Sequence, residues 1–360
     1  MATNEKEMKP EIRTAQYRLL ELLCNAGGVS GDEGEVRKIV VDQLSDIADD
    51  LQVDSLGNVL VKRVGRKRTR LKVMVAAHMD EIGFMITFDA GDGIFRFGTV
   101  GGIDPRQLVG KPVLVGKDKV PGVIGAKPIH LTTSEERKKP ISKKALRIDV
   151  GPENKGKVKV GDRAIFATKY RRIGPSIRAK ALDDRLGVAT LIELVKNPPT
   201  NIDLLAAFTV QEEVGLRGAR VAAFGLDPDI AIALDCTPAY DLPTQDDEEN
   251  VRYNTRLGFG PAIYIADRGT LSDPRIIRHI IDTAEKAGIP YQLRQPGGGG
   301  TDAAAIHRQK TGIPSVSVSV PGRYAHTAAG LCRISDWKNT LALIYTALAQ
   351  LSPKVLADDR

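Results

Sequence analysis

The sequence has little cysteine, few aromatic residues and no long apolar run, and each scarcity excludes a class of protein. Three scattered cysteines in 360 residues form neither a disulfide framework nor the paired spacing of a zinc finger. No apolar stretch reaches the roughly 20 residues that a membrane-spanning helix needs. The first nine residues are polar and lack the apolar centre of a secretory signal. We therefore expect a cytoplasmic protein without a membrane partner.

The sequence also lacks a large excess of either charge sign. The net charge of +7 permits nucleic-acid binding but does not argue strongly for it. The densest basic run, residues 62–70, lies between two expected strands and carries no aromatic side chain on which bases could stack. We interpret this run as a solvated turn and expect no nucleic-acid partner. A contact between subunits is the alternative role for it.

What the sequence does contain is an alternation of expected strands and helices, interrupted once. From residue 84 to residue 172 the chain is rich in Gly, Val and Lys, with short alternating segments and many turns. Elsewhere strands and helices alternate, which is typical of a parallel sheet covered by helices. We predict an α/β fold with a mixed, mainly parallel sheet and helices on both faces, formed by residues 1–83 and 173–360. Residues 84–172 are predicted to be an inserted, barrel-like β domain.

The chain from residue 30 to residue 44 carries a helix-start signal. Glu33 follows Ser30 at the spacing of a capping box, in which each residue satisfies a backbone N–H near the start of a helix. We expect this box to begin a helix that runs to Leu44.

An apolar run ending in His-x-Asp organises the rest of the chain. Residues 73–77 read as a buried strand, and His78 and Asp80 follow it directly. Ligands of open α/β sheets bind beyond the carboxyl ends of the strands, and side chains at i and i+2 leave a strand on the same side. His78 could therefore bind a metal while Asp80 orients it. In isolation, a His-x-Asp at a strand end is more often a capping or hydrogen-bonding pair.

A pair of glutamates is the most informative dipeptide. Glu212 and Glu213 follow the apolar strand of residues 204–210 and precede Gly215. Adjacent carboxylates repel, so we expect them to be neutralised differently. One could bind a metal while the other serves as general base towards a bound water. The alternative is a solvated acidic pair at the start of a helix, which the preceding apolar strand disfavours.

Further carboxylates and a second histidine stand at comparable places. Asp235 and His326 each follow an expected strand, and Asp183 begins an expected helix, where the helix macrodipole favours negative charge. Imidazole and carboxylate ligands suit zinc, cobalt or manganese. Five such ligands would suit two metals that share one carboxylate, the usual co-catalytic arrangement for hydrolysis.

Five segments together resemble the M42 family of di-metal aminopeptidases, the family of the tetrahedral, or TET, peptidases. The resemblance extends over nearly the whole chain and keeps the order of the motifs. Its segments are Ala77-His78-Met79-Asp80-Glu81-Ile82-Gly83, Ala181-Leu182-Asp183-Asp184-Arg185-Leu186-Gly187, Glu212-Glu213-Val214-Gly215-Leu216-Arg217-Gly218-Ala219, Gly299-Gly300-Thr301-Asp302-Ala303 and Arg323-Tyr324-Ala325-His326.

The resemblance implies a role for each candidate residue. His78, Asp183 and Asp235 would hold one divalent metal ion, and Asp183 would also hold the second. Glu213 and His326 would complete the second site. Each subunit would bind two ions, zinc first, with cobalt or manganese as alternatives.

The resemblance also implies an activity and an assembly. Glu212 would take a proton from the water between the two metals, and Asp80 would orient His78. The enzyme would hydrolyse the N-terminal peptide bond of short peptides. Residues 84–172 would be a dimerisation domain, with dimers assembled into a tetrahedral dodecamer.

One departure from the family pattern concerns the substrate pocket. After His326 the family usually continues with a small polar residue and proline, whereas here Thr327-Ala328-Ala329-Gly330 follows. Because His326 is intact, metal binding is still expected, but the pocket beside it could differ.

Two other functions compete with a peptidase. An endoglucanase could also use paired carboxylates, but a single tryptophan, Trp337, offers little for sugar stacking. A basic nucleic-acid-binding or scaffold protein would leave the whole set of metal-type ligands without a purpose.

Overall fold

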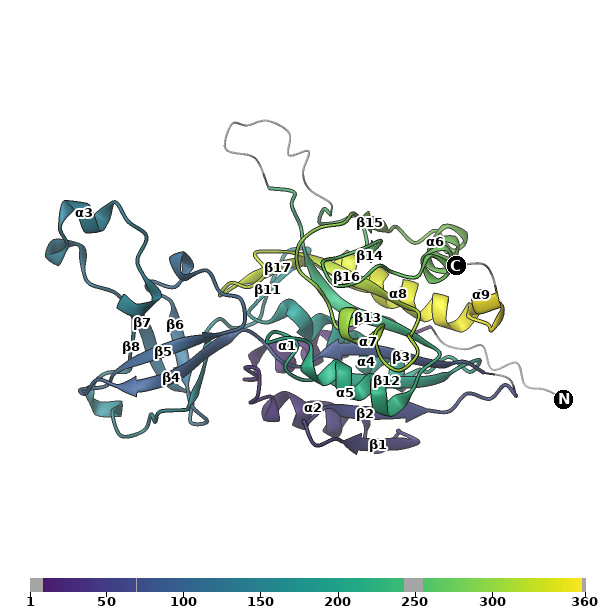
Figure 1. Ribbon diagram of the computed structural model, residues 1–360, viewed down its shortest axis with the longest axis horizontal. Helices are drawn as coiled ribbons and strands as arrows, with labels where there is room; N and C mark the ends of the chain where they lie inside the picture. The colour runs from purple at the N-terminus through teal and green to yellow at the C-terminus, as the bar shows by residue number, and fades with distance from the viewer. Residues whose placement is uncertain (1–8, 69, 243–254, 358–360) are drawn as a thin grey trace.

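The computed structural model describes residues 9–68, 70–242 and 255–357. They form a large sheet covered by helices and, beside it, a closed antiparallel barrel (Figure 1). The predicted α/β fold with an inserted barrel is confirmed. Among the described residues, no helix is long and apolar enough to cross a membrane.

The sheet is mixed, with its parallel strands at the centre. Strands β12, β3, β13 and β16 pair in parallel, in that order, and antiparallel strands continue the sheet on both sides. Strands β14 and β15 form a parallel pair that extends from β16. The order along the sheet is β1 (Asp50–Val53), β2 (Val59–Arg63), β12 (Asp203–Thr209), β3 (Lys72–His78), β13 (Ile230–Pro238), β16 (Ser315–Arg323), β17 (Gly330–Arg333), β11 (Ser176–Ala179) and β10 (Arg171–Ile173), with β14 (Ala262–Tyr264) and β15 (Gln292–Arg294) attached.

Alternation along β3 explains how both faces of this sheet become buried. Val73, Val75 and Ala77 join the larger hydrophobic cluster, whereas Met74 and Ala76 join a smaller one on the other face. Successive side chains of a strand point to opposite faces, so an unbroken apolar run requires helices on both. The larger cluster includes α1 (Thr14–Asn25), α2 (Gly34–Leu44), α4 (Leu182–Lys196), α6 (Pro274–Ala287) and α8 (Ile334–Gln350).

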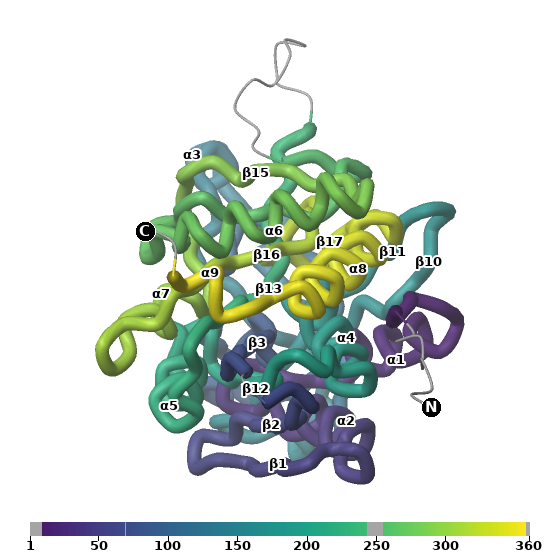
Figure 2. The backbone as a smooth tube through the Cα atoms, turned by 90° about the vertical axis from the view of Figure 1, so that its right-hand side faces the viewer, coloured from purple at the N-terminus to yellow at the C-terminus, as the bar shows by residue number. Residues whose placement is uncertain are grey.

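Two shorter helices cover the other face. Helices α5 (Arg217–Leu226) and α7 (Ala303–Ile306) pack together there, and Figure 2 shows them on the opposite side of the molecule from α1 and α2. A last short helix, α9 (Lys354–Ala357), follows α8 and contacts α6.

The barrel has a core of its own. It closes in the order β4 (Gly83–Asp89), β5 (Ile94–Val100), β8 (Arg147–Asp149), β7 (Val120–Gly125), β6 (Pro112–Val115) and β9 (Arg163–Phe166). Inside it, the Phe84 ring meets Phe97 and Phe166 edge-on, with ring centroids 5.2 and 5.1 Å apart. Its loops carry the short helices η1 (Pro105–Gln107), η2 (Ile129–Leu131), α3 (Ser134–Arg137), η3 (Lys143–Ala145) and η4 (Pro152–Asn154).

The predicted capping box at Ser30 is wrong. Helix α2 begins at Gly34, with Glu33 as its N-cap residue. The Ser30 hydroxyl donates instead to the Asp80 carboxylate, 2.6 Å away and 50 residues later in the chain. A local pattern could not reveal this competing partner, because β3 brings it into reach only in the folded state.

Candidate active site

The candidate residues converge at the carboxyl ends of the central strands. His78 ends β3, and Glu212 and Glu213 follow β12. Asp235 lies in β13, and His326 follows β16. Because these four strands are parallel neighbours, their carboxyl ends meet at one edge of the sheet.

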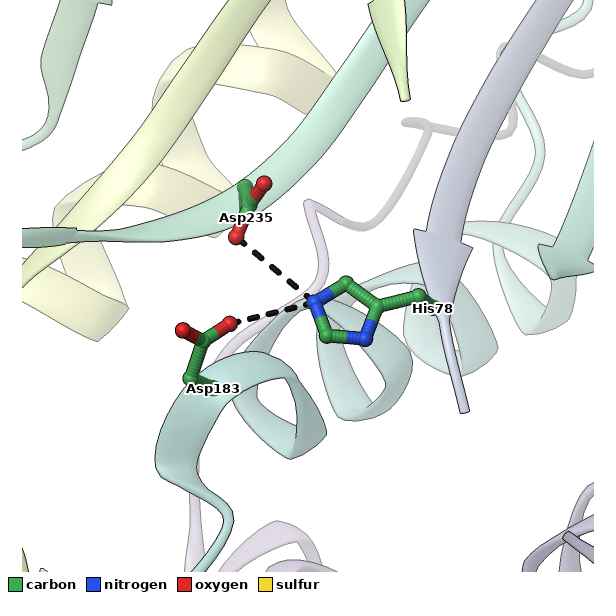
Figure 3. Close-up of side chains that lie close together, drawn as sticks. All are labelled: His78, Asp183 and Asp235. Carbon is green, nitrogen blue, oxygen red and sulfur yellow. Dashed lines mark hydrogen bonds and ion pairs between the residues drawn. The ribbon is translucent and has the colours of Figure 1, made fainter. Parts of the chain in front are cut away.

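A first group of possible metal ligands consists of His78, Asp183 and Asp235 (Figure 3). The His78 Nε2 atom lies 3.1 Å from Asp183 Oδ1 and 3.8 Å from Asp235 Oδ1. The His78 side chain is 2% exposed and that of Asp235 is 8% exposed. Asp183 reaches the group from the first turn of α4.

A second group consists of Asp183, Glu213 and His326. The His326 Nε2 atom lies 3.5 Å from Asp183 Oδ2 and 3.4 Å from Glu213 Oε2. Asp183 therefore offers one carboxylate oxygen to each group. In both groups the offered ligand atoms lie within 4.8 Å of one another.

Both histidines are held so that Nε2 faces the carboxylates. The His78 Nδ1 atom lies 3.2 Å from the Asp80 carbonyl oxygen, and the His326 Nδ1 atom lies 2.9 Å from the Gly102 carbonyl oxygen. A ring N–H that donates to a carbonyl leaves the other nitrogen with a free lone pair, as in most metal-binding histidines. Gly102 belongs to the loop after β5, so the barrel segment also helps to position the site.

The carboxylates of the site share a buried and electrostatically crowded place. Burial, followed by repulsion from Asp183, raises the pKa of Glu213 to about 8 and that of Asp235 to about 7. Burial also raises the pKa of Glu212 well above its ordinary value, and nearby Asp235 adds to this shift. Such shifts mean that ionised carboxylates here need nearby positive charge. A cluster of this composition suits divalent cations.

The two imidazoles respond to the same crowding in the opposite direction. The hydrogen bond that His326 donates to the Asp183 carboxylate raises the pKa of His326 to about 10. Burial lowers the pKa of His78, but the nearby carboxylates, Glu212 first, outweigh it and raise that pKa well above its ordinary value. The pKa of the Asp183 carboxyl is lowered, because hydrogen bonds from both imidazoles outweigh its burial.

The Asp80 carboxylate holds the backbone of the glutamate pair. It accepts the backbone N–H of Glu212 at 3.0 Å and that of Glu213 at 3.1 Å. Its oxygen lies farther from His78 Nδ1, at 3.5 Å. Asp80 is fully buried, so these contacts are protected from water. In this geometry Asp80 fixes Glu212 and Glu213 at least as directly as it orients His78.

A cavity of about 440 Å³ opens beside the two groups. That volume is in the range of small-molecule binding sites. Its lining includes residues of both ligand groups and three positions that the sequence did not indicate: Tyr240, Tyr264 and Arg294.

Sequence reasoning also gave Asp302 too small a role. The sequence analysis included Asp302 in a motif without a role of its own, but its buried carboxylate accepts a hydrogen bond from Thr209 and raises the pKa of Glu212. The signal available in the sequence was its place in the motif Gly299-Gly300-Thr301-Asp302-Ala303. Its burial, which is unusual for an aspartate without a partner, is visible only in the structure.

Comparison with known proteins agrees with this geometry. The family model for M42 glutamyl aminopeptidases matches residues 57–343. The lysyl aminopeptidase of Pyrococcus furiosus is 32% identical over 94% of this chain and 98% of its own. An aminopeptidase structure from Desulfurococcus kamchatkensis is 36% identical, with a TM-score of 0.89, over 95% of this chain and 97% of its own.

Two further solved structures bear on assembly and on the competing function. The TET1 peptidase of Pyrococcus horikoshii, which can assemble into a tetrahedron or a large octahedral shell, is 33% identical with a TM-score of 0.81, over 93% of this chain and 100% of its own. A Thermotoga maritima protein described as an endoglucanase is also 33% identical, with a TM-score of 0.76, over 94% of this chain and 98% of its own.

The family match spans most of the chain, including every candidate residue of the site. Peptidases of this family depend on metal, and the two ligand groups offer the side chains for it. The chain therefore belongs to the M42 glutamyl aminopeptidase family and is a peptide hydrolase.

Proposed function

We propose that this protein is a two-metal aminopeptidase that removes the N-terminal residue of short peptides. One observation carries the proposal: two ligand groups share Asp183, which turns a different oxygen to each. A single metal would not require two complete groups, and a structural site would be expected to use cysteine.

The metal ligands in this proposal are the five residues of the two groups. His78 and Asp235 would complete one site, Glu213 and His326 the other, and Asp183 would belong to both. A pair of divalent ions supplies a water of lowered pKa and polarises the substrate carbonyl. Zinc is the first candidate, and cobalt or manganese would also suit imidazole and carboxylate ligands.

Glu212 is the general base in this mechanism. It lines the cavity beside the ligand groups, and it belongs to neither of them. Its carboxylate would accept a proton from the attacking water and then deliver that proton to the leaving amine nitrogen. Asp80 supports this step by holding the Glu212 backbone N–H, which limits the positions that the carboxylate can take.

A panel of free and N-acetylated aminoacyl-anilides tests the activity. We expect cleavage of the free amines, little cleavage of their acetylated counterparts, and loss of activity on chelation. Activity should return when zinc, cobalt or manganese is restored, and the ion that gives the highest kcat/KM would indicate the preferred metal. The acetylated substrates are matched controls, because they change only the amine.

The competing functions predict different results when a soluble β-glucan and a nucleic acid are tested beside the anilides. An endoglucanase would hydrolyse a soluble β-glucan and would be indifferent to chelation, since glycosidases of this kind use two carboxylates without metal. A nucleic-acid-binding protein would form a salt-sensitive complex that survives removal of metal. Either result, together with no cleavage of free aminoacyl-anilides, would contradict the proposal.

Residues 84–172 are, in this proposal, a dimerisation domain inserted into a catalytic domain of residues 1–83 and 173–360. The separate hydrophobic core of the barrel supports this division, and the assembly of the TET1 relative supports a tetrahedral dodecamer built from dimers. Sedimentation velocity should give a particle of about twelve times the 38.9 kDa chain, with dimers as the smaller species. A stable monomer would contradict both parts. A cytoplasmic location remains a prediction.

A further inference from the structure

The side chain of Arg294 is a buried cation beside the candidate active site. It is 3% exposed and lines the 440 Å³ cavity together with Glu212 and Asp235. A guanidinium keeps its charge in proteins, and a buried charge without an opposite charge is costly. A positive charge buried at the wall of a cavity is therefore expected to have a negatively charged partner.

Among the residues that the structure describes, Arg294 has only neutral hydrogen-bond partners. Its Nε donates to Thr237 Oγ1 at 3.0 Å, and Nη2 donates to the Gly298 carbonyl at 2.8 Å. Its Nη1 lies 3.5 Å from the carbonyl oxygens of Ala266 and Gln295. These contacts fix the guanidinium plane and leave its charge without a carboxylate.

Other arginines in and around the site are paired differently. Arg185 is also fully buried, and its Nη2 lies 3.1 Å from the Glu81 carboxylate. Arg323, near His326, forms a two-point contact with Asp241 at 2.7 and 2.9 Å. Arg185 and Arg294 are the buried arginines among the described residues, and of these Arg294 is the one without a carboxylate contact.

The position of Arg294 is fixed by strand register. It stands opposite Tyr264 in the β14–β15 pair, and its guanidinium lies 4.3 Å from the centre of the Tyr264 ring. Stacking on an aromatic face orients the guanidinium. Nη2 carries two N–H groups, and only one hydrogen bond from it, to Gly298, is made within the protein, so its second N–H can donate to a ligand. The cation is thus held rigidly at the wall of the cavity.

The link to the reaction centre runs along β13. Asp235 and Thr237 are two residues apart in this strand, so their side chains leave on the same side, roughly 7 Å apart. Thr237 holds Arg294, and Asp235 belongs to the first ligand group. A substrate whose scissile bond lies at the ligand groups would place its first side chain within reach of Arg294.

We propose that Arg294 binds a carboxylate of the substrate. This inference rests on the proposed aminopeptidase function and adds a substrate class to it. The carboxylate could come from the side chain of an acidic first residue or from the C-terminus of a dipeptide. The names of known relatives do not decide whether the first residue is acidic, since the family model is described as glutamyl and one relative as a lysyl aminopeptidase.

Two matched substrate pairs test the proposal in the wild-type enzyme loaded with metal. Glutamyl- and glutaminyl-anilide differ only in the side-chain carboxylate, and Ala-Ala and its amide differ only at the C-terminus. We expect kcat/KM to favour the acidic member of one pair by roughly tenfold or more, the effect of one charge-assisted hydrogen bond. The pair that shows the preference identifies the source of the carboxylate.

Variants then connect the preference to the residue. Arg294→Met should bring the ratio close to one, chiefly by raising KM for the acidic substrate, and Arg294→Lys should keep part of the preference. Arg323→Met is the matched control, because its guanidinium is already paired, and it should keep the wild-type ratio. If Arg294→Met does not fold, the wild-type ratios and Arg294→Lys still decide.

The outcomes separate this inference from the proposed function. Ratios near one for both pairs in the wild type, or a preference that folded Arg294→Met retains, would overturn the role of Arg294 while leaving the aminopeptidase intact. No cleavage of any free aminoacyl-anilide with zinc, cobalt or manganese would overturn both.

Discussion

Replacing Asp183 with Asn should remove the activity and both metals together. Asp183 is shared by the two ligand groups, and an amide cannot supply two anionic oxygens. Losing the bound ions forfeits several kcal/mol of transition-state stabilisation, a fall in kcat on the order of 10³-fold or more. The measurement pairs kcat with metal content by mass spectrometry of the purified variant.

Asp235→Asn is the matched control for this experiment, because Asp235 belongs to one group alone. It should weaken one site and leave the other occupied, so that metal content falls to about one ion per subunit, a number set by the two-site proposal. Asp183→Asn with both ions retained and near wild-type kcat would show that Asp183 does not bridge. Thermal unfolding of each variant distinguishes a lost ligand from a lost fold.

Replacing Glu212 with Gln should separate catalysis from metal binding. The two side chains have nearly the same shape, but the amide cannot accept the proton of the attacking water. General acid–base catalysis contributes about 10²–10⁴-fold, so kcat should fall by that factor while metal content stays at the wild-type level. The exposed Glu21→Gln on α1 is a control for the loss of one carboxylate.

Asp80→Asn provides a graded comparison in the same assay. It weakens the hold on the Glu212 and Glu213 backbone without removing the base itself, and outer partners of this kind are typically worth about 10–100-fold. A loss of activity in Glu212→Gln smaller than that in Asp80→Asn would argue against Glu212 as the base. Metal loss in Glu212→Gln would instead make Glu212 a ligand.

The strand ends could be predicted from the sequence because the signal there is local. An apolar run such as residues 73–77 must lie between two layers, and the polar residue after it must emerge at the end of the strand. This reasoning placed His78 and the glutamate pair at strand ends, where the structure has them. Asp235, expected after its strand, instead lies within β13, which continues to Pro238. The change in texture after residue 84 likewise revealed the barrel, whose short strands and turns have a pattern of their own.

Tertiary structure decided which of these ends meet. The order β12-β3-β13-β16 brings together residues more than a hundred positions apart, and no periodicity along the chain encodes that order. It placed Asp183 between His78 and His326, and it gave Ser30 a partner other than the helix predicted for it.

The contacts of Arg294 were equally beyond local patterns. Its position depends on the register of two three-residue strands, β14 and β15, and on a carbonyl of the glycine-rich loop at Gly298. By itself, the sequence determined the elements and the chemical types at their ends, because burial and strand period act locally. The shared carboxylate and the buried cation arose only from long-range packing, because their geometry depends on which strands become neighbours.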